Sequence, residues 1–170
     1  ELCLILENIM LKVNNLTTKF RVGQDEVVAV DDISFHIPPG KVIGLVGESG
    51  SGKSVTSLSI MNLLPPNGRV DTGRVLWKDQ DLSVLSQREL RQIRGNEIGM
   101  IFQNPTAALN PVFTVGNQLV ETIRLHHPCT KEEAKRESIE LLRRVNIPDP
   151  EHRFYQYPHE FSGGMCQRAM

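Results

Sequence analysis

Apolar and polar residues alternate along the first part of the chain. The alternation runs through Leu11–Phe20 and Glu26–Ile37, and residues 23–25 between them carry a turn signal. A period of two places the apolar side chains on one face of a strand. The pattern predicts two or three antiparallel strands, and a further short strand is expected at Arg74–Trp77, after Gly73.

Two short segments are apolar without alternation. Lys41–Val46 follows a break at Pro38–Gly40, and Glu97–Phe102 lies further along the chain. Continuous apolar runs of this length are typical of parallel strands that are covered on both faces. Each segment is therefore expected to form a buried strand.

Helical spacing appears in three places. Lys53–Leu64 carries apolar residues at helical intervals and is stopped by the prolines that begin at Pro65, and Ser86–Arg94 has a similar pattern. Thr130 opens a capping box with Glu133 at the start of a third helix. The buried face predicted for that helix consists of Ala134, Ser138, Leu141, Leu142 and Val145.

Composition indicates an ordinary globular chain. Its 170 residues are 39% apolar and 5% aromatic, and 19 basic against 20 acidic residues give a net charge of -1. Because no basic field is available to hold a polyanion, nucleic acid is not expected as a partner. No apolar stretch approaches the roughly 18 to 20 residues needed to cross a bilayer.

The cysteines do not form a recognisable framework. Cys3, Cys129 and Cys166 lie far apart in an odd number, which favours a reducing cytoplasm. His126 and His127 stand close to Cys129, but adjacent side chains diverge and a proline constrains the turn, so no metal site is expected there. Arginines recur at helical spacing at positions 88, 91 and 94; with acidic Glu89 among them, a solvated helix side is favoured over a basic contact face.

Residues 47–54, directly after the apolar segment Lys41–Val46, match a phosphate-binding motif. The motif is G-x-x-x-x-G-K-[ST], the phosphate loop (P-loop, Walker A), between an expected strand and an expected helix. Glycines let phosphate oxygens approach main-chain N–H groups, and the helix N-terminus adds a positive field. The nucleotide-binding set predicted here is Gly47, Glu48, Ser49, Gly50, Ser51, Gly52, Lys53 and Ser54.

Two residues of this loop have distinct expected roles. Lys53 is expected to reach the β- and γ-phosphates, and the Ser54 hydroxyl to bind Mg²⁺. The cofactors predicted are therefore ATP, or another nucleoside triphosphate, and Mg²⁺. The motif alone leaves ATPases, GTPases and kinases open.

Two later motifs narrow the choice. EIGMIFQNP places Gln103 after an apolar run, and EFSGGMCQR places a Ser-Gly-Gly turn before an amphipathic stretch. In this order, from about Leu11 to Met170, the chain resembles the ATP-binding cassette (ABC) ATPases. The segments FQNPTAALNPVFTVGNQL and YPHEFSGGMCQRAM are similar in sequence to the ATPase subunits of oligopeptide, dipeptide and nickel importers.

The resemblance implies further site residues. Gln103, at the glutamine loop, would sense Mg²⁺ and the attacking water. An aromatic ring from the first strands would stack on adenine, and Phe20 is the best match, although a phenylalanine in an alternating strand is more often a core residue. The signature residues that would cover the γ-phosphate bound to a second subunit are Ser162, Gly163 and Gly164.

One position departs from the subfamily. Cys166 stands where an arginine is usual, so a positive charge beside the signature is absent. Sequence drift and a weaker contact with the opposite nucleotide are both open interpretations.

The resemblance also implies an architecture and its limits. We expect an α/β fold, with a P-loop NTPase core and an N-terminal antiparallel β subdomain over about 11–103. A helical insertion is expected over about 104–160, and the signature motif lies at 161–170. Residues 1–170 would then be part of a nucleotide-binding domain. The strand ending in Asp-Glu (Walker B) would follow Met170, and Glu48 and Glu160 do not replace it by position. The chain as printed is therefore expected to bind ATP without hydrolysing it.

The function expected of the intact protein is ATP-driven import of oligopeptides or dipeptides, with nickel as a further cargo. By the resemblance, its partners would be membrane permease subunits, a second ATPase subunit in a head-to-tail dimer and, indirectly, an extracytoplasmic substrate-binding protein. The resemblance also implies that the protein is bound peripherally to the cytoplasmic face of the membrane. Two alternatives stay open: a cassette ATPase that works as a mechanical switch without transport, and a nucleotide-binding module without catalysis.

Overall fold

The computed structural model describes residues 10–104 and 108–170. Within it the chain forms two compact units, one ending at Leu90 and the other beginning at Arg91. Each unit has its own set of contacts and is treated by itself below. The division between subdomains at residues 103 and 104 stays a prediction.

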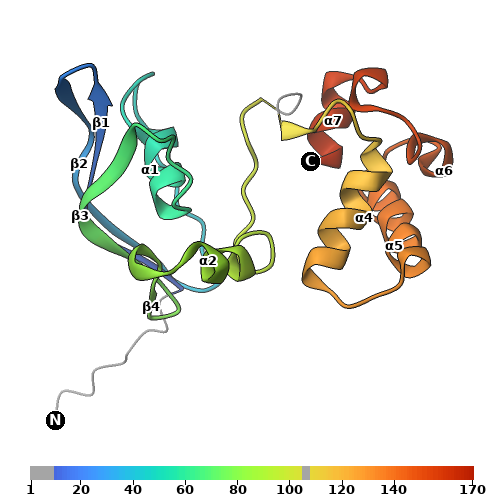
Figure 1. The fold of residues 1–170 in the computed structure, drawn as a ribbon, viewed down its shortest axis with the longest axis horizontal. Helices are drawn as coiled ribbons and strands as arrows, with labels where there is room; N and C mark the ends of the chain where they lie inside the picture. The colour runs from blue at the N-terminus through green and yellow to red at the C-terminus, as the bar shows by residue number, and fades with distance from the viewer. Residues whose placement is uncertain (1–9, 105–107) are drawn as a thin grey trace, which may run out of the picture. The chain divides into compact units, whose positions relative to one another are not determined.

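The first unit is built on an antiparallel sheet with the strand order β2-β1-β3-β4 (Figure 1). β1 (Leu11–Val22) and β2 (Asp25–Ile37) form a hairpin, in which Val22 faces Asp25 across the turn. Gly23 in that turn has φ +65, a conformation that favours glycine. The antiparallel strands predicted from the alternation are confirmed.

A helix covers one face of this sheet. The side chains of Val13, Leu16 and Thr18 on β1 are fully buried. α1 (Lys53–Ile60) contacts β1, β2 and β3, and the hydroxyls of Thr18 and Ser59 form a buried hydrogen bond of 2.8 Å. Since a buried hydroxyl is costly without a partner, this bond fixes the helix on the strand.

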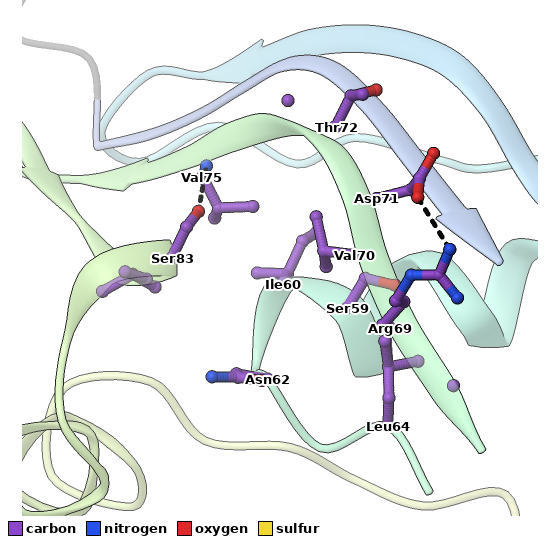
Figure 2. A pocket seen from close by; sticks show the side chains of 13 residues that line it. Ser59, Ile60, Asn62, Leu64, Arg69, Val70, Asp71, Thr72, Val75 and Ser83 are labelled. Atoms are coloured by element: carbon purple, nitrogen blue, oxygen red, sulfur yellow. Dashed lines mark hydrogen bonds and ion pairs between the residues drawn. The ribbon is translucent and has the colours of Figure 1, made fainter. Parts of the chain in front are cut away.

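α1 is shorter than the pattern predicted. It ends at Ile60 with Met61 as its C-cap, rather than at Leu64. A cavity of about 390 Å³ lies between the end of this helix and β3 (Gly68–Trp77). Figure 2 shows Ser59 and Ile60 of the helix beside Val70 of the strand.

β3 is longer than the short strand predicted at Arg74–Trp77. Gly73 does not interrupt it, because this glycine takes φ +94 at an irregularity in the pairing with β1. A Cβ on Gly73 would lie 2.4 Å from the carbonyl oxygen of Asn15. The elements that follow β3 are β4 (Gln80–Asp81), η1 (Leu82–Val84) and α2 (Gln87–Ile93). α2 spans the boundary between the two units at Leu90.

The prediction of two buried parallel strands is wrong for this structure. Residues 41–46 form no strand, and Val42 and Val46 are 96% and 97% exposed. Glu97–Phe102 makes a single bridge, between Ile98 and Arg94. A parallel strand is held by hydrogen bonds to neighbouring strands, and the described residues supply none for either segment beyond that bridge.

The second unit is helical (Figure 1). Its elements are α4 (Val115–His126), α5 (Lys131–Arg144), α6 (Pro150–Arg153), η2 (Pro158–Glu160) and α7 (Gly163–Ala169). The capping box is confirmed: Thr130 Oγ1 accepts from the Glu133 amide (3.2 Å), and Glu133 accepts from the Thr130 amide (2.8 Å). Ala134, Ser138 and Leu142 form the buried face of α5, as predicted. The prediction is wrong for Val145, which is the C-cap of α5 and is exposed, and Leu141 is half-buried.

An apolar cluster holds the described part of this unit together. The buried residues that pack in it are Val115, Val120, Ile123, Ala134, Leu142, Ile147, Phe154, Phe161 and Cys166. They come from α4, from α5, from α7 and from the segment between α5 and α7, so burial of their apolar surface joins elements distant in sequence. None of the helices in the described ranges has both the length and the apolar character that a bilayer crossing requires.

Candidate functional site: a phosphate loop and a signature turn

The predicted phosphate loop lies directly before α1. Gly52, the N-cap of α1, has φ +88, and a Cβ there would lie 2.4 Å from the carbonyl oxygen of Ala29 on β2. Gly50 has φ +83, and a Cβ on Gly47 would lie 2.6 Å from Ser51 Oγ. A Cβ would displace main chain at Gly52 and the Ser51 side chain at Gly47, whereas Gly50 is favoured by its backbone conformation alone.

The lysine of the motif points into the loop. Lys53 Nζ donates to the carbonyl oxygens of Gly47 (2.7 Å) and Glu48 (2.5 Å) and to Ser51 Oγ (3.2 Å). Its ammonium therefore lies inside the loop, beside the first turn of α1, whose leading amides have no partner within the helix. Ser54, the next residue, is exposed at the same place.

These residues fit the group that the resemblance implies. A phosphate tail needs N–H donors, a cation and main chain free of side-chain bulk, and the loop provides a helix N-terminus, one ammonium and glycines where a Cβ would clash. A Mg²⁺ ion needs oxygen ligands, which the exposed Ser54 hydroxyl supplies. The described residues contain no cluster of three or more His, Cys, Asp or Glu suited to a metal.

Phe20 lies in β1 within the same unit. It pairs with Val27 on β2 and with Gly68 on β3. Its half-buried ring lies across Gly68, where a Cβ would come within 2.7 Å of the ring. Sequence reasoning missed Gly68; an isolated glycine at a strand end is the signal for such a close approach.

Gln103 and the signature residues belong to the second unit. Gln103 is exposed, in a segment without regular secondary structure. Ser162 is the N-cap of α7, and its hydroxyl accepts from the Met165 amide at 3.2 Å. A Cβ on Gly163 or Gly164 would meet nothing within 4 Å, so the turn is open to close approach.

Cys166 lies in the core of the helical unit. Its side chain is fully buried, and its thiol donates to the Pro158 carbonyl oxygen at 3.4 Å. Burial raises the pKa of this thiol above its usual range, so it remains neutral. The structure gives Cys166 a packing role. Cys129 is a free, half-buried thiol, and Cys3 is outside the described residues.

The antiparallel sheet, the phosphate loop that leads into α1 and the helical unit that ends in a Ser-Gly-Gly turn define a nucleotide-binding cassette. The model of the ABC transporter family matches residues 30–170, most of the chain. The chain belongs to the ABC transporter family.

Comparison with individual proteins places it close to peptide import ATP-binding proteins. The chain is 48% identical over 162 residues to the oligopeptide transport ATP-binding protein OppD of Bacillus subtilis (strain 168). That alignment covers 95% of this chain and 45% of OppD. The chain spans about half the length of the curated relatives it matches.

Solved structures share the fold. A dimeric, post-hydrolysis state of the ATP-binding cassette MJ0796, bound to ADP and Pi, matches with a TM-score of 0.82 and 25% identity over 94% of this chain and 66% of that one. CbiO1 from Clostridium perfringens, part of an ABC transporter complex, matches with a TM-score of 0.68 and 25% identity. That match covers 96% of this chain and 59% of CbiO1. The ABC cassette fold, mixed α/β with an antiparallel sheet, is therefore shown.

Proposed function

We propose that this chain is the nucleotide-binding part of an ATPase subunit that couples ATP binding and hydrolysis to the import of peptides. The observation that carries the proposal is the position of the Lys53 ammonium, among the carbonyls of its own loop at the start of α1. The 48% identity to an oligopeptide transport protein supports peptides as cargo, with nickel as the alternative.

The phosphate loop binds the triphosphate in this proposal. Lys53 leaves the carbonyl oxygens of Gly47 and Glu48 and donates to the β- and γ-phosphate oxygens, since an anionic acceptor is stronger than a neutral carbonyl. The Ser54 hydroxyl binds Mg²⁺, which neutralises charge on the phosphates when bound. Glycines let the main chain approach the phosphate oxygens closely.

Phe20 and Gln103 have separate tasks in this proposal. The Phe20 ring lies close to Gly68, and in this proposal a face of the ring stacks on the adenine base. Gln103, on an exposed segment, orients the attacking water and senses Mg²⁺ through its amide. The loop around Gln103 also touches the membrane permease.

The signature turn acts on a second subunit. Ser162, Gly163 and Gly164 cover the γ-phosphate bound to the other ATPase subunit in a head-to-tail dimer. The open space at both glycines and the dimeric state of the solved MJ0796 cassette support this arrangement. The assembly works at the cytoplasmic face of a membrane, together with permease subunits and a substrate-binding protein.

Calorimetry on the whole gene product tests nucleotide binding. We expect Mg²⁺-ATP uptake by the wild-type protein and at least a tenfold weaker uptake by Lys53→Ala, because the ammonium contacts the charged phosphates. Lys41→Ala removes an exposed lysine outside the loop and is the control. Equal binding by wild type and Lys53→Ala would contradict the proposal.

Reconstitution with its permease tests the cargo. Vesicles that contain the complete transporter and ATP should accumulate a labelled oligopeptide, and should not do so with Lys53→Ala. Accumulation of Ni²⁺ without peptide would replace peptide import by metal import.

A further inference from the structure

A glutamine on α4 closes the preceding loop onto the helix. Gln118 Nε2 donates to the carbonyl oxygens of Asn110 (3.0 Å) and Phe113 (3.1 Å), and Gln118 Oε1 accepts from the Asn110 amide (2.9 Å). Asn110 Oδ1 also accepts from the Val112 amide at 3.1 Å. One half-buried side chain thus makes three hydrogen bonds to main chain, and it fixes residues 110–113 to the first turns of α4.

The same end of α4 holds a second segment. The amides of Val115 and Gly116 donate to the carbonyl oxygens of Gln156 and Phe154, each at 2.9 Å. A Cβ on Gly116 would lie 2.4 Å from that Phe154 oxygen and 2.5 Å from the Phe154 ring. Because the contact is with main chain, no side-chain rotation relieves it. Glycine is needed for α4 to lie against this segment.

The second segment leads directly to the signature turn. Glu160 accepts from the Tyr157 amide at 2.7 Å, which closes the turn after Gln156. The Cys166 thiol donates to the Pro158 carbonyl oxygen, which ties this turn to α7. Ser162 caps α7 between these two contacts. The position of Ser162 is therefore set by a chain of local contacts that begins at α4.

We propose that Gln118 is a positioning residue of the ATPase reaction, and that the first turns of α4 join residues 110–113 to the segment carrying Ser162. A displacement of residues 110–113 is passed by Gln118 to α4, and by the amides of Val115 and Gly116 to the signature turn. The inference rests on the proposed function, since it assigns a residue that positions the signature turn of that function.

Gln118→Glu is the first test, in the whole gene product assembled with its transporter partners. The change keeps the shape of the side chain but places a carboxylate oxygen opposite two carbonyl oxygens. We expect kcat for ATP to fall at least tenfold, with KM and the calorimetric affinity for Mg²⁺-ATP within twofold of wild type, because the phosphate loop belongs to the other unit. Gln118→Leu, which removes the bonds without adding charge, should reproduce the loss.

Asn117→Asp is the matched control. It adds the same charge on the same turn, at an exposed residue, and should leave kcat within twofold of wild type. A kcat within twofold for both Gln118 variants would overturn the proposal. An equal loss in the control, or a parallel loss of nucleotide affinity, would overturn it too, because either result would mean general damage.

A double-mutant cycle with Gly116→Ala tests the connection itself. If both residues act in one chain of contacts, Gly116→Ala with Gln118→Glu should lose no more kcat than the worse single variant. A loss equal to the product of the two single losses would show independent effects and overturn the proposal. Calorimetry on wild type separates the two proposals: no nucleotide uptake would end both, whereas normal uptake with an unaffected Gln118→Glu would end this one alone.

Discussion

Gly52 occupies the point where the phosphate loop becomes α1. Its φ of +88 and its approach to Ala29 put two demands on one residue, a left-handed conformation and the absence of a Cβ. Gly40 meets only the first demand, because it has φ +69 and a Cβ there would meet nothing within 4 Å. The two glycines therefore separate backbone strain from steric contact.

Gly52→Ala should destabilise the protein more than Gly40→Ala. Both changes force alanine into a left-handed conformation, at a cost of about 1–2 kcal/mol. The contact with the Ala29 carbonyl oxygen adds at least about 1 kcal/mol more in Gly52→Ala. Urea-induced unfolding followed by circular dichroism measures the difference in the free energy of unfolding between the two variants. Equal unfolding midpoints would contradict the prediction and would mean that β2 shifts to make room for the added methyl group.

At the scale of an element, ion pairs join three strands of the sheet. Lys19 on β1 lies 2.5 Å from Asp71 on β3, and Arg69 donates to both carboxylate oxygens of Glu26 on β2 (2.7 and 3.1 Å) and to Asp71 (3.0 Å). The hydrogen bond from Lys19 holds the pKa of Asp71 below its ordinary value of 3.8, and the one from Arg69 lowers the pKa of Glu26. Figure 2 shows the contact between Arg69 and Asp71.

This network predicts a pH dependence with a definite sign. A carboxyl whose pKa is lower in the folded state stabilises the protein above its unfolded pKa, and this stability is lost as the pH falls through the folded pKa. Asp71→Asn should therefore be less stable than wild type at pH 7, and the gap should close below about pH 4. Thermal unfolding of both proteins at several pH values measures this difference in stability. A difference that does not depend on pH would mean that the substitution acts through packing and not through charge.

The cap of α5 gives a second prediction at this scale. Thr130→Ala removes the hydroxyl that accepts from the Glu133 amide and should cost about 1 kcal/mol, within a range of about 0.5–2. Thr130→Ser keeps the hydroxyl and is the control. Chemical denaturation followed by helical circular dichroism gives both values, and a serine variant as unstable as the alanine variant would contradict the capping explanation.

At the scale of the whole molecule, the second unit contains an exposed segment without regular structure. Residues 99–104 form neither helix nor strand, and Ile101 and Phe102 are 75% and 43% exposed. Exposed main chain outside helices and strands is the preferred substrate of proteases. By contrast, Phe154 and Phe161 are 5% and 8% exposed in the helical core.

Limited proteolysis tests this picture on the 170-residue chain. Chymotrypsin should cleave first after Phe102, because its cleavage requires an extended, accessible main chain on both sides of the aromatic residue. Mass spectrometry identifies the fragments, and Phe102→Ser should remove the first cut while leaving later ones. A first cut at Phe154 or Phe161 would mean that the helical core opens before the segment at residues 99–104 is cleaved.

Much of the local structure could be predicted from sequence, because its causes are local. The alternation in Leu11–Phe20 predicted a strand of the hairpin, and Thr130 with Glu133 predicted the start of a helix. The phosphate-loop motif located the candidate nucleotide site. The extent of β3 was not predictable, because Gly73 looked like a break and is instead accommodated by its contact with Asn15. The three hydrogen bonds of Gln118 left no pattern in the sequence at all.

By itself, then, the sequence determined which segments alternate, where helices begin and which residues resemble the motifs of an ABC cassette. Tertiary structure decided the rest: Lys41–Val46 forms no strand, Phe20 lies close to Gly68, and the first turns of α4 hold the segments at 110–113 and 154–156. The physical reason is that turns, caps and periodicity depend on neighbours along the chain, whereas strand pairing and main-chain contacts between distant segments require partners that only folding brings together.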